Sequence, residues 1–151
     1  MDSIEMFKFC LDDPHISKIF RGVYSRDRLP SSIDIKPCAF IVNTHPSTMP
    51  GEHWLAIHFD SKGHAEFFDP YGKAPINFDL EHFLQTTSTS WSYNNKQIQA
   101  PLSLMCGPIC LFYLFFRCRN FSLQTLQSFF TQDYKNNEKL IRNFIILFTK
   151  N

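Results

Sequence analysis

Hydrophobic positions at helical spacing mark both ends of the chain. Apolar residues recur every three or four positions over residues 3–11, and again over 122–130, where Ser122 is the cap, and over 138–148. This spacing places the apolar side chains on one face, so it predicts amphipathic helices. A further short helix is expected to start at Asp13 as its N-cap and to run through Phe20.

The middle of the chain has the pattern of strands. Residues 38–43 form an unbroken apolar run, and residues 53–60 alternate in polarity, which predicts two strands. Residues 61–64 are typical of a hairpin turn, so a third strand over 65–69 should pair with the second. Shorter elements are expected as a surface helix over 78–85, a linker over 86–90, and brief strands over 91–93 and 96–99.

The segment from Cys106 to about Arg117 is apolar on all sides, which predicts a buried central helix. We therefore expect an α+β fold in which a small, mostly antiparallel sheet packs on a buried helix that starts at Cys106. The 151 residues contain no internal repeat and no composition break. A single domain over residues 1–151 is the expected organisation.

Composition excludes several classes of protein. A hydrophobic content of 44% with 17 phenylalanines indicates a folded globular protein. The net charge of +1 predicts no strong general attraction to nucleic acid or membrane surfaces. The longest apolar run, over residues 109–116, is far shorter than the roughly 20 residues that span a bilayer. The acidic start of the chain lacks the pattern of a secretion signal, so a soluble protein that is not secreted is expected.

The cysteines are Cys10, Cys38, Cys106, Cys110 and Cys118. Their number is odd and most have apolar neighbours, which is typical of reduced core thiols in a reducing compartment. Cys106 and Cys110 share a helix face, but no Cys-x-x-Cys or histidine pair accompanies them, so no structural zinc is expected. Cys106 alone stands before a glycine where a turn enters a helix, an unusual place for a core thiol.

Cys106 has the setting of a nucleophile, because the positive end of a helix favours thiolate over thiol. A catalytic cysteine needs a base within reach, and that base needs a group to orient it. His53 starts one predicted strand and Asp69 ends the next, so an antiparallel hairpin makes the two neighbours. The same geometry separates His53 from His58, which points to the opposite face, and from His64 in the turn.

An amide donor completes the set of candidate catalytic groups. Gln99 precedes Cys106 on a loop, so its amide can lie beside the backbone N–H of Cys106 and stabilise an oxyanion. Gln97 is the rival for this role. Trp54 either covers the imidazole of His53 or packs in the core. These are the groups of a cysteine protease, in the chain order His, Asp, Gln, Cys.

Four segments, in this order, resemble the adenovirus maturation protease family (adenain). They are residues 37–44, 51–54, 68–72 and 99–107, and residues 20–24 are similar as well. The resemblance covers roughly residues 15–118. It implies a papain-like (adenain/Ulp-type) cysteine protease fold with reordered connectivity, related to the SUMO-specific proteases. It also implies a viral-type endopeptidase that processes viral precursor and capsid proteins during virion maturation.

By position in these motifs, the resemblance implies His53 as the base and Cys106 as the nucleophile. Asp69 then orients the imidazole, where the adenoviral enzymes have glutamate, and Gln99 belongs to the oxyanion hole. No metal is required, and glycine or other small residues should flank the scissile bond. The expected substrate contacts are Gly51, Trp54 and Gly107.

The resemblance also raises the question of activators. The adenoviral enzymes carry a cysteine before the glutamine that forms a disulfide with an activating viral peptide, whereas residues 86–95 here contain none. An activating peptide or DNA is thus implied only by resemblance, and the net charge of +1 predicts weak or no DNA binding. We expect a monomer in the virion and the host nucleus or cytoplasm. The candidate members of a local basic patch that could bind DNA are Lys8, Lys18, Arg21, Arg26 and Arg28.

Two other functions use or retain this set of residues. An isopeptidase that removes ubiquitin-like modifiers has the same constellation, but such enzymes usually carry an acidic or amide residue before Cys-Gly, where this chain has Met105. A non-catalytic interaction module with the same fold is the third hypothesis. The presence of all four chemical roles argues against it. The segment from Phe121 onward matches little of the family.

Overall fold

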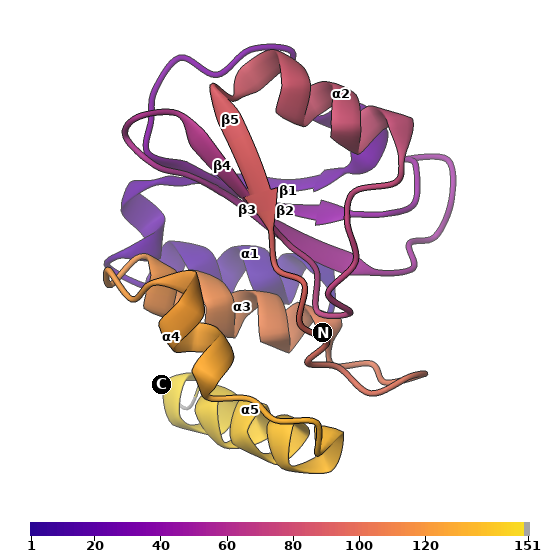
Figure 1. Cartoon of the computed structure of the whole chain (residues 1–151), viewed down its shortest axis with the longest axis vertical. Coiled ribbons are helices and arrows are strands. Elements are labelled where there is room, and N and C mark those ends of the chain that lie inside the picture. Colours follow the sequence, from indigo (N-terminus) through magenta and orange to yellow (C-terminus); the bar gives the residue numbers. More distant parts are fainter. Residues whose placement is uncertain (150–151) are drawn as a thin grey trace.

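A five-stranded sheet is the middle layer of the molecule, with α2 on one face and the other helices on the opposite face (Figure 1). The computed structural model describes residues 1–149. The strands lie in chain order as β1 (Phe20–Ser25), β2 (Cys38–Asn43), β3 (Trp54–Phe59), β4 (His64–Phe68) and β5 (Ser90–Tyr93). The helices are α1 (Ser3–Asp12), α2 (Phe78–Thr87), α3 (Cys106–Arg117), α4 (Leu123–Ser128) and α5 (Tyr134–Thr149), with single 3₁₀ turns at Ile16–Lys18 and Arg26–Arg28.

The three central strands are antiparallel, as the sequence predicts, and the two outer strands are not. β2 pairs with β3 and β3 with β4 in antiparallel fashion, whereas β1 pairs with β2 and β4 with β5 in parallel. A parallel pair needs a crossover connection. Helix α2 is the crossover between β4 and β5, and residues 26–37 connect β1 to β2. The sheet is therefore mixed at its edges.

Two predicted elements are wrong. The helix expected to run through Phe20 stops after one 3₁₀ turn, although the Asp13 carboxylate does accept hydrogen bonds from the N–H groups at its start. Phe20 instead pairs with Ala39 and begins β1. The strand expected over residues 96–99 is irregular, because the N–H groups of Ile98 and Gln99 both donate to the Pro70 carbonyl.

Other boundaries differ by a few residues. The expected linker 86–90 is shorter, since residues 86–87 belong to α2 and Ser90 to β5. Helix α4 begins after Ser122, which caps it as predicted, and ends at Ser128. Helix α5 starts at Tyr134, four residues before the predicted helix.

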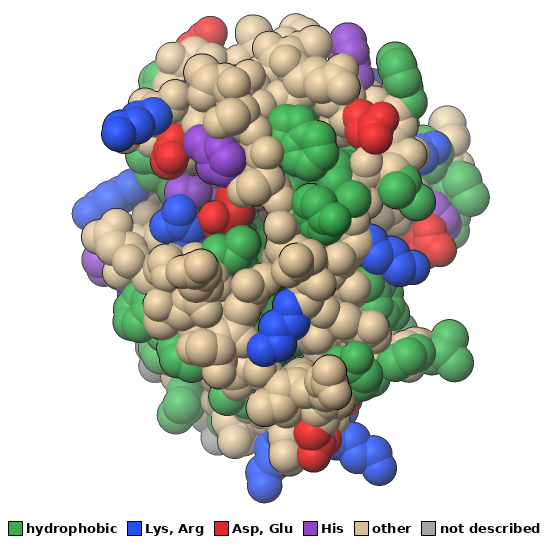
Figure 2. Space-filling model, viewed as in Figure 1, with side chains coloured by type: hydrophobic (Ala, Val, Ile, Leu, Met, Phe, Trp, Pro, Cys, Tyr) green, Lys and Arg blue, Asp and Glu red, His purple; other side chains and the backbone are tan. Residues whose placement is uncertain are grey.

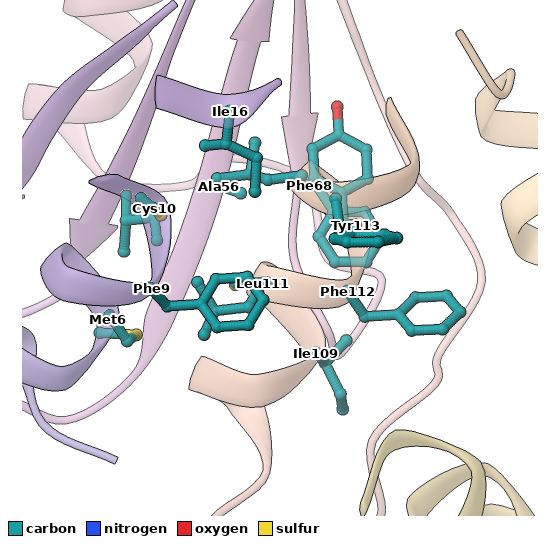
Figure 3. Packing of buried hydrophobic residues seen from close by; sticks show 14 of the residues in the cluster. Met6, Phe9, Cys10, Ile16, Ala56, Phe68, Ile109, Leu111, Phe112 and Tyr113 are labelled. Carbon is teal, nitrogen blue, oxygen red and sulfur yellow. The ribbon is translucent and has the colours of Figure 1, made fainter. Parts of the chain in front are cut away.

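Helix α3 lies at the centre of the larger hydrophobic core, as its uniform apolar character predicts. Its residues are buried from Cys106 to Phe115. Figure 3 shows α3 side chains meeting α1 on one side and the sheet on the other, with the Tyr113 ring stacked on Phe68 at 4.2 Å between centroids. The Tyr113 hydroxyl donates to buried Glu66 on β4. These contacts fix the helix against β4 and so fix the position of its first residue, Cys106.

A second core cluster lies on the opposite face of the sheet, under α2. Phe40, Phe59 and Phe83 pack edge-to-face there, at centroid separations between 5.6 and 6.1 Å. The predicted surface helix is therefore amphipathic, with its inner residues in this second core. In the described part of the chain, no helix is both long enough and apolar enough to span a bilayer.

Candidate active site

The β3–β4 hairpin brings His53 and Asp69 together. Ala56 pairs with Phe68 in the antiparallel register, so the residue just before β3 and the residue just after β4 lie at the same edge of the sheet. The Nε2 atom of His53 lies 2.7 Å from Oδ1 of Asp69. This is the neighbourhood that the hairpin geometry of the sequence predicts. His58 and His64 lie elsewhere on the hairpin and make no contact with this pair.

Cys106 approaches the same imidazole from the start of α3. Its thiol lies near His53 and near the backbone N–H groups of Trp54 and Gly107, and all three lower its pKa. Because Nε2 of His53 faces Asp69, Nδ1 is the ring nitrogen left for the thiol. Nucleophile, imidazole and carboxylate thus form one chain of interactions from the first residue of α3, the residue before β3 and the residue after β4.

The pKa values of His53 and Cys106 are both shifted in the direction that favours the charged form of each group. Burial alone would lower the pKa of His53, but hydrogen bonds to Asp69 and Cys106, together with their negative charges, raise it from 6.5 to about 9. Burial alone would raise the pKa of Cys106, but the hydrogen bond and charge of His53 and the two backbone N–H groups lower it below 9.0. Both shifts favour a thiolate beside an imidazolium.

Cys106 differs in this respect from the other four cysteines. Burial raises the pKa of Cys10, Cys38 and Cys110 above the ordinary value, and that of Cys118 to about 12. All five are free thiols. A low thiol pKa is the property that makes a cysteine reactive at neutral pH, and among these residues the electrostatic setting supplies it only to Cys106.

No pattern in the sequence distinguished Asn94, which holds Asp69 in place. This buried side chain follows β5 and makes two hydrogen bonds to the peptide groups of Asp69: it accepts from the N–H at 2.7 Å and donates to the carbonyl at 2.6 Å. It lies 25 positions from Asp69 in the chain. Only the parallel pairing of β5 with β4 makes them neighbours.

Tyr71 is a second residue that was not assigned a role, although it lies in the 68–72 segment. Its ring stacks on His53, with centroids 4.8 Å apart and planes 28° from parallel. Its backbone N–H donates to the Asp69 oxygen that faces His53, at 2.8 Å. Tyr71 therefore covers the imidazole of His53, which was one of the two positions predicted for the Trp54 ring. The Trp54 ring packs instead beside Gly107, where an added Cβ would lie 3.5 Å from Trp54 Cδ1.

Gln99 lies on the loop that leads to Cys106, but its amide faces that loop. The side chain is fully buried, and Nε2 donates to the Ser103 carbonyl at 2.6 Å, while Oε1 is buried without a partner. Gln97, the rival, donates to the Gln99 carbonyl. No hydrogen bond joins either amide to Cys106 in the described residues. The role of Gln99 in an oxyanion hole remains a prediction.

Two of the three predicted substrate contacts, Gly51 and Trp54, line a cleft of about 550 Å³ beside the site. Residues 45–47, 49–50 and 1–3 line it as well. Gly51 has φ +96° and faces the Asn43 amide. The backbone conformation therefore favours glycine at this position, whether or not it contacts substrate. Gly107 packs under Met6, whose sulfur would lie 3.0 Å from an added Cβ. Across residues 1–149, no cluster of three or more His, Cys, Asp or Glu residues is arranged to hold a metal.

The sequence is similar to those of adenoviral proteases. It is 32% identical over 112 residues to the protease of human adenovirus A serotype 12, covering 64% of this chain and 50% of that protein. It is 30% identical over 125 residues to the protease of bovine adenovirus 2, covering 73% of this chain and 60% of that one. The chain thus spans about half to three fifths of the length of these relatives. No family model matches it.

Two solved structures share the fold. The crystal structure of the ASFV protease superposes with a TM-score of 0.62 at 18% identity, covering 90% of this chain and 63% of that one. The structure of ChlaDub1 from Chlamydia trachomatis superposes with a TM-score of 0.57 at 16% identity, covering 74% of this chain and 58% of that one. These likenesses establish the papain-like architecture that the resemblance to the adenovirus protease family implies.

Proposed function

We propose that this chain, an adenain-like protein of the papain-like cysteine protease fold, is a viral-type cysteine endopeptidase. The observation that carries the proposal is the setting of Cys106. It is the one cysteine whose pKa is lowered, and the group that lowers it, His53, is itself held by Asp69. Sequence similarity to adenoviral proteases supports the same activity.

The proposed reaction is acyl transfer. The Cys106 thiolate attacks the scissile carbonyl carbon, and the oxyanion that forms is held by the Cys106 N–H and the Gln99 amide. Gln99 must first release the Ser103 carbonyl to donate there. The tetrahedral intermediate then expels the amine, which takes a proton from His53, and leaves a thioester. Water attacks the thioester with His53 as base, releasing the acid and regenerating the thiol.

The substrates we propose are viral precursor polypeptides, including capsid proteins, with small residues flanking the scissile bond. The cleft lined by Gly51 and Trp54 is the proposed site for one side of the substrate chain. The proposed setting is the virion and the infected cell, and the proposed active species is a monomer of one domain. An activating peptide is part of this proposal only by analogy with adenoviral enzymes, and DNA is given a weak role or none at a net charge of +1.

Alkylation of the native protein tests the reactive pair without a substrate. Limiting iodoacetamide is applied between about pH 5 and 9, and mass spectrometry identifies which cysteine reacts. Selective labelling of Cys106 at acid pH, lost in His53→Ala, is the expected result. The matched control is His58→Ala, which removes a nearby histidine on β3 and should leave the labelling intact. Labelling of Cys106 with the profile of an ordinary thiol would contradict the proposal.

The isopeptidase hypothesis uses the same reacting groups, and the likeness to ChlaDub1 shows only a shared fold. Met105 stands before Cys106, where isopeptidases of this type usually carry an acidic or amide residue. Two substrates separate the hypotheses: a ubiquitin-like protein that ends in Gly-Gly and carries a reporter fused after it, and an adenoviral-type precursor peptide. The rates at which the protein cleaves them are compared. Faster cleavage of the fusion would reverse the order of the two proposals.

A further inference from the structure

The side-chain amide of Asn43 is only partly used by the protein. Asn43 ends β2, lines the cleft beside the site and is 7% exposed. Its Oδ1 atom accepts hydrogen bonds from the backbone N–H groups of His45, at 2.8 Å, and Glu52, at 3.2 Å. Because Oδ1 is the only acceptor of the amide, these two bonds fix how the group is turned. The donor atom, Nδ2, is therefore the end that is left for another partner.

Nδ2 of Asn43 has no acceptor within residues 1–149, where the hydrogen bonds of this side chain are the two at Oδ1. The side-chain atoms that are both enclosed and without a partner belong to other residues, so Nδ2 is reached from the cleft. Gly51 keeps it open, because a Cβ added there would lie 3.1 Å from Nδ2. A donor on so buried a residue is poorly hydrated, and leaving it unpaired costs free energy. This points to an acceptor that a ligand supplies.

The sheet register places Asn43 close to the reacting groups. Asn43 pairs with Trp54 between β2 and β3, and residues directly opposite in an antiparallel pair have their side chains on the same face of the sheet. The Trp54 ring lies beside Gly107, and the Trp54 N–H lies near the Cys106 thiol. The Cα atoms of such partners are about 5 Å apart. The free donor therefore belongs to the direct neighbour of a residue that lies against the nucleophile.

We propose that Nδ2 of Asn43 binds the substrate, donating a hydrogen bond to a backbone carbonyl of the polypeptide close to the scissile bond. This inference rests on the proposed endopeptidase function and adds a substrate-binding residue to it. The acceptor is a backbone carbonyl because every residue of a polypeptide presents one. The contact can therefore hold precursors of different sequence in the same position.

The charges around the cleft disfavour the other common acceptor, an acidic side chain of the substrate. Asp2 and Glu52 line the cleft, and no Lys or Arg does. On the face of the molecule shown in Figure 2, by contrast, acidic and basic side chains are interspersed. A carboxylate that entered the cleft would meet two like charges, whereas a neutral carbonyl would not.

Peptides that lack one backbone carbonyl test the contact directly. In a series of otherwise identical peptides, each peptide bond near the scissile bond is replaced in turn by a trans-alkene, which keeps the shape of the bond but has no carbonyl oxygen. The dissociation constants are measured with Cys106→Ala as the host, which binds without cleaving. One replacement in the series should weaken binding about tenfold.

Two variants, made in the same host, should remove that sensitivity. Asn43→Asp keeps the two hydrogen bonds at Oδ1 but has no N–H to donate, and Asn43→Ala removes the donor without adding a charge. Each should bind the unmodified peptide about tenfold more weakly, and the sensitive replacement should then cost nothing further. Asn143→Asp on α5, which is exposed and outside the cleft, is the matched control. In the active protein, Asn43→Asp should raise KM about tenfold with kcat nearly unchanged.

A replacement that is equally costly in the host and in the Asn43 variants would overturn the inference and leave the endopeptidase proposal standing. Equal affinity of the host for every peptide of the series would do the same. Absence of any peptide binding would also overturn it, if Cys106 of the native protein is labelled selectively at acid pH. Ordinary alkylation of Cys106 together with no cleavage would overturn the proposed function itself, and this inference with it.

Discussion

The Asn94 side chain makes two hydrogen bonds to the backbone of Asp69, one to its N–H at 2.7 Å and one to its carbonyl at 2.6 Å. Asn94 is only 1% exposed. Asn94 touches neither Cys106 nor His53. It acts through Asp69, whose carboxylate faces the imidazole. A residue at the edge of the sheet therefore decides where the orienting carboxylate lies.

Replacing Asn94 by alanine should impair both the fold and the reactive pair. Asn94→Ala leaves the N–H and carbonyl of Asp69 without their partners, which should cost about 1–3 kcal/mol in the free energy of unfolding. Alkylation of Cys106 at acid pH should also slow, because the carboxylate that holds His53 is no longer fixed. Urea denaturation and the pH profile of labelling measure the two effects. Asn95→Ala is the matched control, since Asn95 is exposed; equal behaviour of the two variants would exclude the positioning role.

The reactivity of Cys106 should have a broad plateau in pH. The thiolate forms above the lowered pKa of Cys106, and the imidazolium persists below the raised pKa of His53, about 9. Below pH 9.0, Cys106 should therefore be alkylated faster than an ordinary thiol of that pKa, because a larger fraction of it is thiolate. Peptide cleavage should decline as the pH rises through about 9, because His53 can then no longer protonate the leaving amine.

Asp69→Asn should lower the pH at which peptide cleavage declines. The carboxylate is a main cause of the raised pKa of His53, so its loss lets the imidazolium titrate at lower pH. The stability that His53 contributes through its raised pKa is full below 6.5 and lost as the pH rises through about 9. In Asp69→Asn this loss should begin at lower pH in thermal unfolding scans. An unshifted upper limb would contradict the assignment of Asp69 as the partner of His53.

Gly72→Ala should be severely destabilising. Gly72 has φ +69°, and an added Cβ would lie 2.6 Å from the backbone carbon of Lys96, so the backbone of one segment must move. The strained φ and the clash together should cost about 2–4 kcal/mol in the free energy of unfolding. Gly63→Ala provides the comparison, because its φ is +88° but the nearest atom is a Thr89 side-chain carbon at 3.1 Å. Equal destabilisation would mean that φ alone decides the cost.

Phe144→Ala should separate α5 from the rest of the core. The Phe144 ring lies 5.1 Å from both Phe112 and Phe115 on α3, measured between centroids. Its removal should cost about 3–5 kcal/mol in the free energy of unfolding by chemical denaturation. Phe148→Ala, further along α5 and 48% exposed, should cost much less. Equal losses would show that α5 does not depend on the Phe144 contact.

The sequence alone determined much of the fold and the reacting groups. Helix α3 was predictable because every side of it is apolar, and β2 and the β3–β4 hairpin because their patterns are local. The hairpin in turn predicted that His53 and Asp69 would meet. The position of Cys106, between a turn and an apolar helix, distinguished it from the other cysteines by the same local reasoning.

The parts that only the tertiary structure decided depend on contacts between distant segments. Phe20 became a strand residue because it pairs with Ala39, and residues 96–99 are irregular because Pro70 offers them its carbonyl. Asn94 reached Asp69 through the parallel pairing of β5, which no local pattern encodes. The direction of the Gln99 amide was likewise set by where the loop placed the Ser103 carbonyl. Hydrophobic periodicity reports which face of an element is buried, but not which element it meets there.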